Sequence, residues 1–230
     1  MKARGLVLDS RRYRTSVSPP AGLEDTSRFG NDGTFAHGGG GATDPQYVQL
    51  PSGLWVISFD RSEEHYVTIP NMRMNGDKTF ELVAIPSFDA SDAGQYFFLQ
   101  WFIDIDNYIN LDKIALNPPT TFAVAAGGIN GTAQVTYPWN AGEVLIIHAV
   151  LDYTTAPHRR LYINGQLEAD SGAVGIGTMS SSMSTLYIGC KRTPDDFWDG
   201  KLALPRIYSY ALSAADIYAH YQTERRFFGV

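Results

Sequence analysis

Cysteine, basic charge and long apolar runs are all scarce in this sequence of 230 residues. A single cysteine, Cys190, excludes an intramolecular disulfide and any zinc site built from several cysteines. The net charge is −6, whereas proteins that bind nucleic acid draw most of their affinity from a basic face. We therefore expect a fold held together by packing, and we expect no nucleic-acid partner.

The apolar runs are too short for a membrane protein. The longest stretch, from Val144 to Leu151, is interrupted by His148 and falls far short of the ~20 residues that cross a bilayer. The apolar run near the N-terminus is likewise too short for a secretory signal peptide. We expect no membrane insertion, and we expect synthesis in the cytoplasm without a signal peptide.

What the sequence does contain favours one β-rich domain over residues 1–230. Hydrophobic residues make up 44% of the chain and aromatic residues 13%, and all-β sandwiches commonly reach about 200–250 residues as one unit. Alternating patterns between turn-forming residues predict many short strands, which need two stacked sheets. The predicted strands are residues 4–8, 47–50, 54–59, 66–69, 79–85, 96–104, 108–113, 121–126, 133–137, 144–153, 160–163, 185–188 and 201–208.

Two local signals mark a hairpin and a helix. Asn164-Gly165 between apolar residues is the strongest short-range signal for a tight β-hairpin. Ser213 with Asp216 three residues later approximates a capping box, and apolar residues on one face follow from Ile217. We therefore predict a short helix at the C-terminus.

A series of motifs along the chain resembles a known family. The motifs are residues 25–34 (DTSRFGNDGT), 59–60 with 66–70 (FD and YVTIP), 161–165 (LYING), 187–189 (YIG), 197–200 (FWDG), 206–208 (RIY) and 211–217. In this order they resemble the laminin G-like, concanavalin A-like jelly rolls. The resemblance implies an all-β, concanavalin A-like jelly-roll sandwich of two antiparallel sheets. Members of the family include lectin-like modules, adhesion domains, glycosidases and proteins of viral particles. Residues 51–55 (PSGLW) are similar to forms found in phage and in archaeal or metagenomic sequences.

Glycosidases of this fold class carry a Glu-x-Asp-x-x-Glu motif, which holds two carboxylates ~5–5.5 Å apart. No glutamates in the chain have that spacing. Asp104 and Asp106 are the nearest substitute, but the following Asn107 favours a turn with two solvated carboxylates. His148 lies in an apolar run, and we interpret it as a core histidine with satisfied hydrogen bonds. We therefore expect no catalytic activity, and an atypical glycoside hydrolase that uses Asp104 and Asp106 is the enzyme alternative.

The strand at residues 96–104 is apolar or aromatic on both faces. Strict alternation places Gln100 and Asp104 on one face, which we expect to line the concave side where family members hold ligands. Aromatic rings and amides suit sugars, although packing of this face by loops or by a neighbouring subunit is an equal alternative. The candidate ligand-binding residues are Tyr96, Phe98, Gln100, Phe102, Asp104 and Asp106, with Trp139 and Trp198 from loops.

The resemblance also raises the question of calcium, because many jelly rolls of this class tie the N-terminal loop to the last strand through a calcium ion. Asp25 and Asn31 offer oxygen ligands for such an ion. Residues 202–205 (LALP) supply no carboxylate where the family has acidic positions. We expect no cofactor, with calcium at Asp25 and Asn31 as the alternative.

The predicted function is surface recognition without catalysis. The first interpretation is an exposed structural or decoration protein of a viral or phage particle that also binds glycans, located on the virion surface or outside the cell after release. Its partners would be glycans, other particle proteins or further copies of itself. The alternatives are a stand-alone carbohydrate-binding adhesion domain and the atypical glycoside hydrolase.

Overall fold

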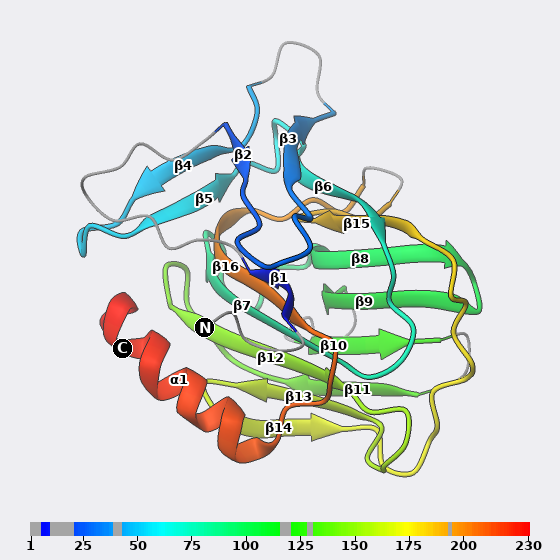
Figure 1. The fold of residues 1–230 in the computed structure, drawn as a ribbon. Coiled ribbons are helices and arrows are strands. Elements are labelled where there is room, and N and C mark those ends of the chain that lie inside the picture. The colour runs from blue at the N-terminus through cyan, green and yellow to red at the C-terminus, as the bar shows by residue number, and fades with distance from the viewer. Residues whose placement is uncertain (1–5, 10–20, 39–42, 116–120, 128–130, 193–194) are drawn as a thin grey trace.

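Two antiparallel sheets of eight strands each form the molecule, and a C-terminal helix lies against the first of them (Figure 1). The structure is a computed structural model, and it describes residues 6–9, 21–38, 43–115, 121–127, 131–192 and 195–230. This arrangement confirms the predicted all-β, concanavalin A-like sandwich of two antiparallel sheets with a C-terminal helix. Within the described residues, no helix has the length and apolar character needed to cross a bilayer.

The strand order of each sheet follows from its pairing. The first sheet runs β14 (Gln166–Asp170), β13 (Arg159–Ile163), β12 (Leu145–Leu151), β7 (Lys78–Pro86), β16 (Gly200–Tyr208), β5 (Trp55–Phe59) and β4 (Gln46–Gln49), and β1 (Leu6–Asp9) pairs with β16. The second sheet runs β11 (Thr132–Thr136), β10 (Thr121–Ala126), β9 (Asn107–Ile114), β8 (Tyr96–Asp104), β15 (Ser184–Ile188), β6 (His65–Met72), β3 (Gly33–His37) and β2 (Gly22–Leu23).

The sequence analysis missed three of these strands, namely β2, β3 and β14. β2 contains only two residues, and β3 begins at a glycine, which weakens its strand pattern. β14 lies at the edge of its sheet and consists mainly of polar or weakly β-forming residues. Pairing with β13 across the predicted hairpin gives it the strand conformation that its own residues do not favour.

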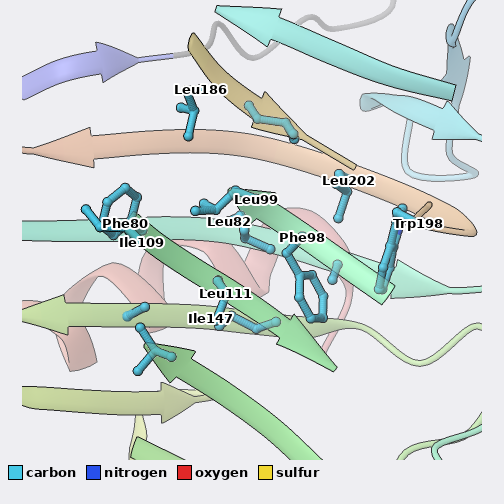
Figure 2. Close-up of a cluster of buried hydrophobic side chains, with 14 of the residues drawn as sticks. Phe80, Leu82, Phe98, Leu99, Ile109, Leu111, Ile147, Leu186, Trp198 and Leu202 are labelled. Carbon is cyan, nitrogen blue, oxygen red and sulfur yellow. The ribbon is translucent and has the colours of Figure 1, made fainter. Parts of the chain in front are cut away.

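The hydrophobic core lies between the two sheets (Figure 2). The labelled core residues of the first sheet are Phe80, Leu82, Ile147 and Leu202, and those of the second sheet are Phe98, Leu99, Ile109, Leu111 and Leu186. Trp198, just before β16, is fully buried with them. Each large apolar side chain buried in this way contributes about 1.5–3 kcal/mol, so packing supplies the stability that disulfides do not.

A β-bulge interrupts the alternation of β8. In its pairing with β9, Phe97 faces Asp112 and Leu99 faces Leu111, which leaves Phe98 as the extra residue. Tyr96 and Phe98 therefore point into the core before the bulge, and Leu99 points into it afterwards. The predicted strict alternation over residues 96–104 is wrong for this reason.

The helix α1 (Ala214–Phe228) begins as predicted. The Ser213 hydroxyl accepts a hydrogen bond from the Asp216 amide, and the Asp216 carboxylate accepts one from the Ser213 amide, so the capping box is confirmed. Ile217 anchors the helix in a small apolar cluster with residues of β12, β13 and β16. Behind this cluster, buried charged side chains join the helix to the sheet.

The buried charges centre on Arg206 of β16. Its Nη1 lies 2.7 Å from Oε1 of Glu81 on β7 and 2.8 Å from Oε1 of Glu224 on α1. Burial alone would raise the pKa of Glu81, but the hydrogen bond with His220 and the charge of Arg206 outweigh it and hold that pKa well below its usual range. The ion pairs therefore link two strands and the helix in their charged forms.

The predicted hairpin joins β13 to β14 and touches the helix. Asn164 and Gly165 both have positive φ, as the type I′ turn requires, and the hairpin is confirmed. A Cβ added to Gly165 would lie 2.8 Å from Cδ1 of Tyr221 on α1. The absence of a side chain at this position lets the helix approach the turn.

We predict that Gly165→Ala lowers the free energy of unfolding by about 2–4 kcal/mol. The left-handed backbone of a non-glycine residue contributes about 1–2 kcal/mol of this loss, and the clash with Tyr221 contributes the rest. Gly172→Ala is the matched control because Gly172 also has a positive φ but has no atoms within 4 Å of an added Cβ. Urea unfolding of both variants measures the difference, and equal losses would contradict the proposed contact between hairpin and helix.

Candidate functional site

The outer face of the second sheet carries a group of aromatic and amide side chains. They come from four neighbouring strands, alternate with core residues, and are half-buried except for the buried Gln100. We call this group the outer-face platform, and it consists of Tyr66 on β6, Tyr187 on β15, Gln100 and Phe102 on β8, and Tyr108 and Asn110 on β9.

Register brings the platform residues together. Gln100 pairs with Tyr187 on one side and with Asn110 on the other, so these three side chains form a row across the sheet. The rings of Tyr66 and Tyr187 have centroids 6.4 Å apart. Phe102 pairs with Tyr108 in the next row, and their rings stack at 6.4 Å.

Hydrogen bonds fix the central amides. Gln100 Nε2 donates to Asn110 Oδ1 at 2.9 Å, and Gln100 Oε1 accepts from the backbone N–H of Arg192 at 2.7 Å. Among the described residues, none accepts a hydrogen bond from Asn110 Nδ2, and the residue is half-buried. An oriented amide beside half-exposed rings is the chemistry that binds a sugar, because rings stack on C–H faces and amides pair with hydroxyls.

The segment after β15 borders the platform. The guanidinium carbon of Arg192 lies 3.9 Å from the centroid of the Phe102 ring, a cation–π contact. The rings of Phe197 and Tyr66 are 6.3 Å apart at the other side. Together these contacts place a cation and a further aromatic ring at the edge of the platform.

Asp112 of β9 is the most perturbed carboxyl group near the platform. Burial raises its pKa to about 7, the hydrogen bond from Gln95 Nε2 at 3.2 Å lowers it in part, and the charge of Asp196 raises it further. Strongly perturbed carboxyl groups cluster at functional sites. A carboxyl group with this pKa both donates and accepts hydrogen bonds near neutral pH.

The four aromatic residues Tyr96, Phe98, Trp139 and Trp198 lie in the core and not on the platform. Phe98 and Trp198 have no exposed surface, and their rings pack 4.5 Å apart. Trp139 is also buried, and its Nε1 donates to the carbonyl oxygen of Phe88 at 3.1 Å. The prediction that these four rings contact a ligand is therefore wrong, because all four are buried and pack in the core.

The other predicted residues divide into two groups. Gln100 and Phe102 belong to the platform, whereas Asp104 and Asp106 lie exposed at the turn after β8. Asp104 Oδ1 accepts hydrogen bonds from the Asp106 amide at 2.9 Å and from Asn107 Nδ2 at 2.7 Å. The turn interpretation is confirmed, and the hydrogen bonds engage Asp104 within the turn itself.

The loop that holds Asp25 is closed by its own hydrogen bonds. One oxygen of Asp25 accepts from the amides of Asp9 and Ser27, and the other accepts from the Ser27 hydroxyl and the Asn31 amide, at 2.7–2.9 Å. The Asn31 side chain donates to the carbonyl oxygen of Val7 at 2.6 Å. These donors occupy the carboxylate positions that a calcium ion would need.

A cavity of about 340 Å³ is a second place for a ligand. It lies where the two sheets meet at β3, β4 and β5, and Phe35, Tyr47 and Trp55 line it together with polar groups. Its acidic residue Asp44 already pairs with His37 at 2.8 Å. The platform differs in presenting an oriented amide pair among its rings, and we therefore place the candidate site there.

The sequence analysis missed Tyr66, Tyr108, Asn110, Asp112 and Tyr187. A signal was present, because each of these residues lies on a predicted strand next to at least one apolar core residue. Alternation within those strands predicts an outward position, but only the pairing of distant strands brings these side chains onto one face.

We predict that Asp112→Asn stabilises the protein increasingly as pH rises. The folded chain keeps the Asp112 proton up to about pH 7, whereas the unfolded chain loses it near pH 4, so wild-type stability falls between these values. The variant lacks this titration and should gain on the order of 1–3 kcal/mol over wild type at pH 8 and almost nothing at pH 4. Urea unfolding across this range measures the gain, and Asp106→Asn in the exposed turn is the control. A gain that does not depend on pH would contradict the prediction.

Comparison with known proteins identifies the family. The model of the concanavalin A-like lectin/glucanases superfamily, of laminin G type, matches residues 61–218, which is more than half of the chain. No curated protein matches the sequence. Several solved structures share the fold at low sequence identity.

Domain 4 of AbnA, a GH43 extracellular arabinanase from Geobacillus stearothermophilus solved with arabinotriose, is 14% identical with a TM-score of 0.68, and the match covers 92% of this chain and 97% of that domain. The binding domain of botulinum neurotoxin DC, solved with SialylT, is 11% identical with a TM-score of 0.66, covering 96% of this chain and 52% of that one. Trypanosoma rangeli sialidase is 16% identical with a TM-score of 0.64, and the match covers 98% of this chain and 34% of the sialidase chain.

This chain therefore spans about half the length of the botulinum neurotoxin binding domains that it matches. At these identities the structural similarity shows the fold alone. The family match extends from β6 to β16 and over the start of the C-terminal helix. The chain belongs to the concanavalin A-like lectin/glucanase superfamily.

Proposed function

We propose that the protein recognises glycans through the outer-face platform and does not catalyse a reaction on them. The observation that carries this proposal is the row of Tyr187, Gln100 and Asn110 across three strands, with half-exposed aromatic rings on both sides of it. The rings offer stacking surfaces, and the hydrogen-bonded amides hold their remaining polar groups in fixed positions. A flat face of this kind suits an extended sugar chain better than a small molecule that must be enclosed.

Structural relatives support the chemistry of this proposal. The arabinanase domain was solved with arabinotriose, and the neurotoxin binding domain was solved with SialylT. These ligands belong to those proteins, and they support glycan binding here only through the shared fold. They also supply two probes, arabinotriose and sialylated oligosaccharides, with which a search for the ligand of this protein can begin.

A glycoside hydrolase is the second candidate, and one observation favours it. Burial raises the pKa of Asp112 to about 7, which suits a general acid, and the neighbouring Asp196 is a second carboxyl group. This alternative would be established if the wild-type protein releases reducing sugar from a polysaccharide, Asp112→Asn does not, and the double variant Asp104→Asn, Asp106→Asn still does. Binding of a glycan without turnover would favour recognition alone.

The cellular setting is a further part of the proposal. We retain the prediction of an exposed component of a viral or phage particle, because a recognition module on a particle surface needs a free outer face like the platform. Electron microscopy of assembled particles, with an antibody against this chain, should show label at symmetric positions on a capsid or tail. Label that is confined to the soluble fraction would contradict this setting and leave the glycan proposal standing.

We predict that Tyr187→Ala and Tyr66→Ala each weaken glycan binding about tenfold, because each removes a stacking surface worth about 1–1.5 kcal/mol. Glycan arrays that include arabinotriose and sialylated oligosaccharides identify the ligand, and calorimetry on the strongest hit measures the change. Tyr218→Ala is the matched control, since Tyr218 is an exposed tyrosine on α1. Loss of binding in Trp55→Ala with no change in the platform variants would move the site to the cavity, and absence of any hit would sink the proposal.

A further inference from the structure

A second group of chemically active side chains lies on the opposite side of the molecule, between the first sheet and α1. It consists of Glu81 on β7, His148 on β12 and His220 on α1. Glu81 and His148 face each other directly in the pairing of their strands, and the helix brings His220 over them. We propose that this group is a binding site for a divalent transition metal, with zinc as the ion that it fits best.

The three donor atoms lie close enough together to share one ion. His148 Nε2 lies 3.7 Å from Glu81 Oε2, His220 Nδ1 lies 3.0 Å from the same oxygen, and all three atoms lie within 4.8 Å of one another. Zinc bonds of about 2.0–2.2 Å in a tetrahedral arrangement place neighbouring ligand atoms about 3.3–3.5 Å apart. The observed separations lie on both sides of that value, so small side-chain movements complete the geometry.

An independent observation comes from His148. Its side chain has no exposed surface, and neither ring nitrogen has a hydrogen-bond partner among the described residues. The interpretation of His148 as a satisfied core histidine is therefore wrong. A buried polar group without a partner is costly and calls for an explanation such as a missing ion. A metal ion at Glu81 would supply the partner, because His148 Nε2 is the ring nitrogen on that side.

The surroundings hold the carboxylate in the orientation that a ligand needs. Arg206 Nη1 binds Oε1 of Glu81, which leaves Oε2 directed toward both histidines. The Tyr208 hydroxyl donates to Oε2 at 2.8 Å. Secondary hydrogen bonds of this kind are a regular feature of metal sites. Arg206 repels a cation, but Glu224 at 2.8 Å and Asp9 at 3.2 Å offset its charge.

The donor set selects the type of metal. Two imidazoles and one carboxylate suit zinc and related transition metals, whereas calcium and magnesium prefer oxygen ligands alone. The His220 side chain is 31% exposed, which leaves one ligand of the site accessible from solvent. Because the ligands come from two strands and α1, the bound ion would fasten the helix to the sheet.

The test uses the full chain after treatment with a chelator. Calorimetric titration with zinc chloride should show one equivalent bound, and cobalt should give the visible absorption of a tetrahedral site. His220→Gln should weaken binding at least tenfold and abolish the cobalt band. His37→Gln is the matched control, because His37 also contacts a carboxylate through Nδ1 but lies on the surface beside Asp44. It should bind zinc like wild type.

A second measurement on the wild-type protein does not depend on how any variant folds. Nitrogen-15 spectra of the imidazoles should show that zinc shifts the His148 and His220 signals and leaves the His37 signal in place. Zinc should raise the midpoint temperature of thermal unfolding by several degrees in wild type and leave it unchanged in His220→Gln, because a ligand that binds the folded state stabilises that state. No binding at one equivalent, equal binding in His220→Gln, or unmoved His148 and His220 signals would each overturn the proposal.

Discussion

One extra residue in β8 decides how the aromatic content of this protein is distributed. Phe98 is the extra residue of a bulge, so Tyr96 and Phe98 point into the core up to that position. Leu99 and Trp101 point into the core beyond it. Gln100 and Phe102 are thereby directed to the outer face. Without the bulge, strict alternation would direct either Tyr96 and Phe98 or Leu99 and Trp101 into the core, but not both pairs.

The second constraint is the way in which a helix attaches to an all-β sandwich. The outer face of the first sheet contains the charged Glu81 and Arg206 beside the imidazole of His148, and a solvent-exposed sheet would leave these polar groups hydrated. The helix buries them, and Glu224 pairs with Arg206 while His220 pairs with Glu81, which makes the burial of these two charges tolerable. In the described part of the chain this face is thus occupied by α1, whereas the outer face of the second sheet keeps half-exposed aromatic rings.

The fold followed from local patterns, and the site did not. The hairpin at Asn164-Gly165 and the capping box at Ser213 depend on residues close in sequence, so both were predicted correctly. The bulge at Phe98 depends on the pairing with β9, which no pattern within β8 reveals. The platform likewise needs Tyr66 and Tyr187 to meet across strands that are far apart in the sequence. The expected ligand residues were therefore a mixture of core rings, turn carboxylates and two residues of the outer-face platform.

The aromatic rings of the protein fall into two groups, one in the core and one on the outer face of the second sheet. Phe98 and Trp198 have no exposed surface, so their loss would leave cavities that cost several kcal/mol and unfold part of the sandwich. Tyr66 and Tyr187 are half-buried on the outer face, and their loss removes contact area without opening the core. Total aromatic content cannot distinguish the two groups, but position relative to the bulge and to the sheet pairing can. Substitutions on the platform therefore leave the packing of the core unchanged, whereas substitutions of the core rings do not.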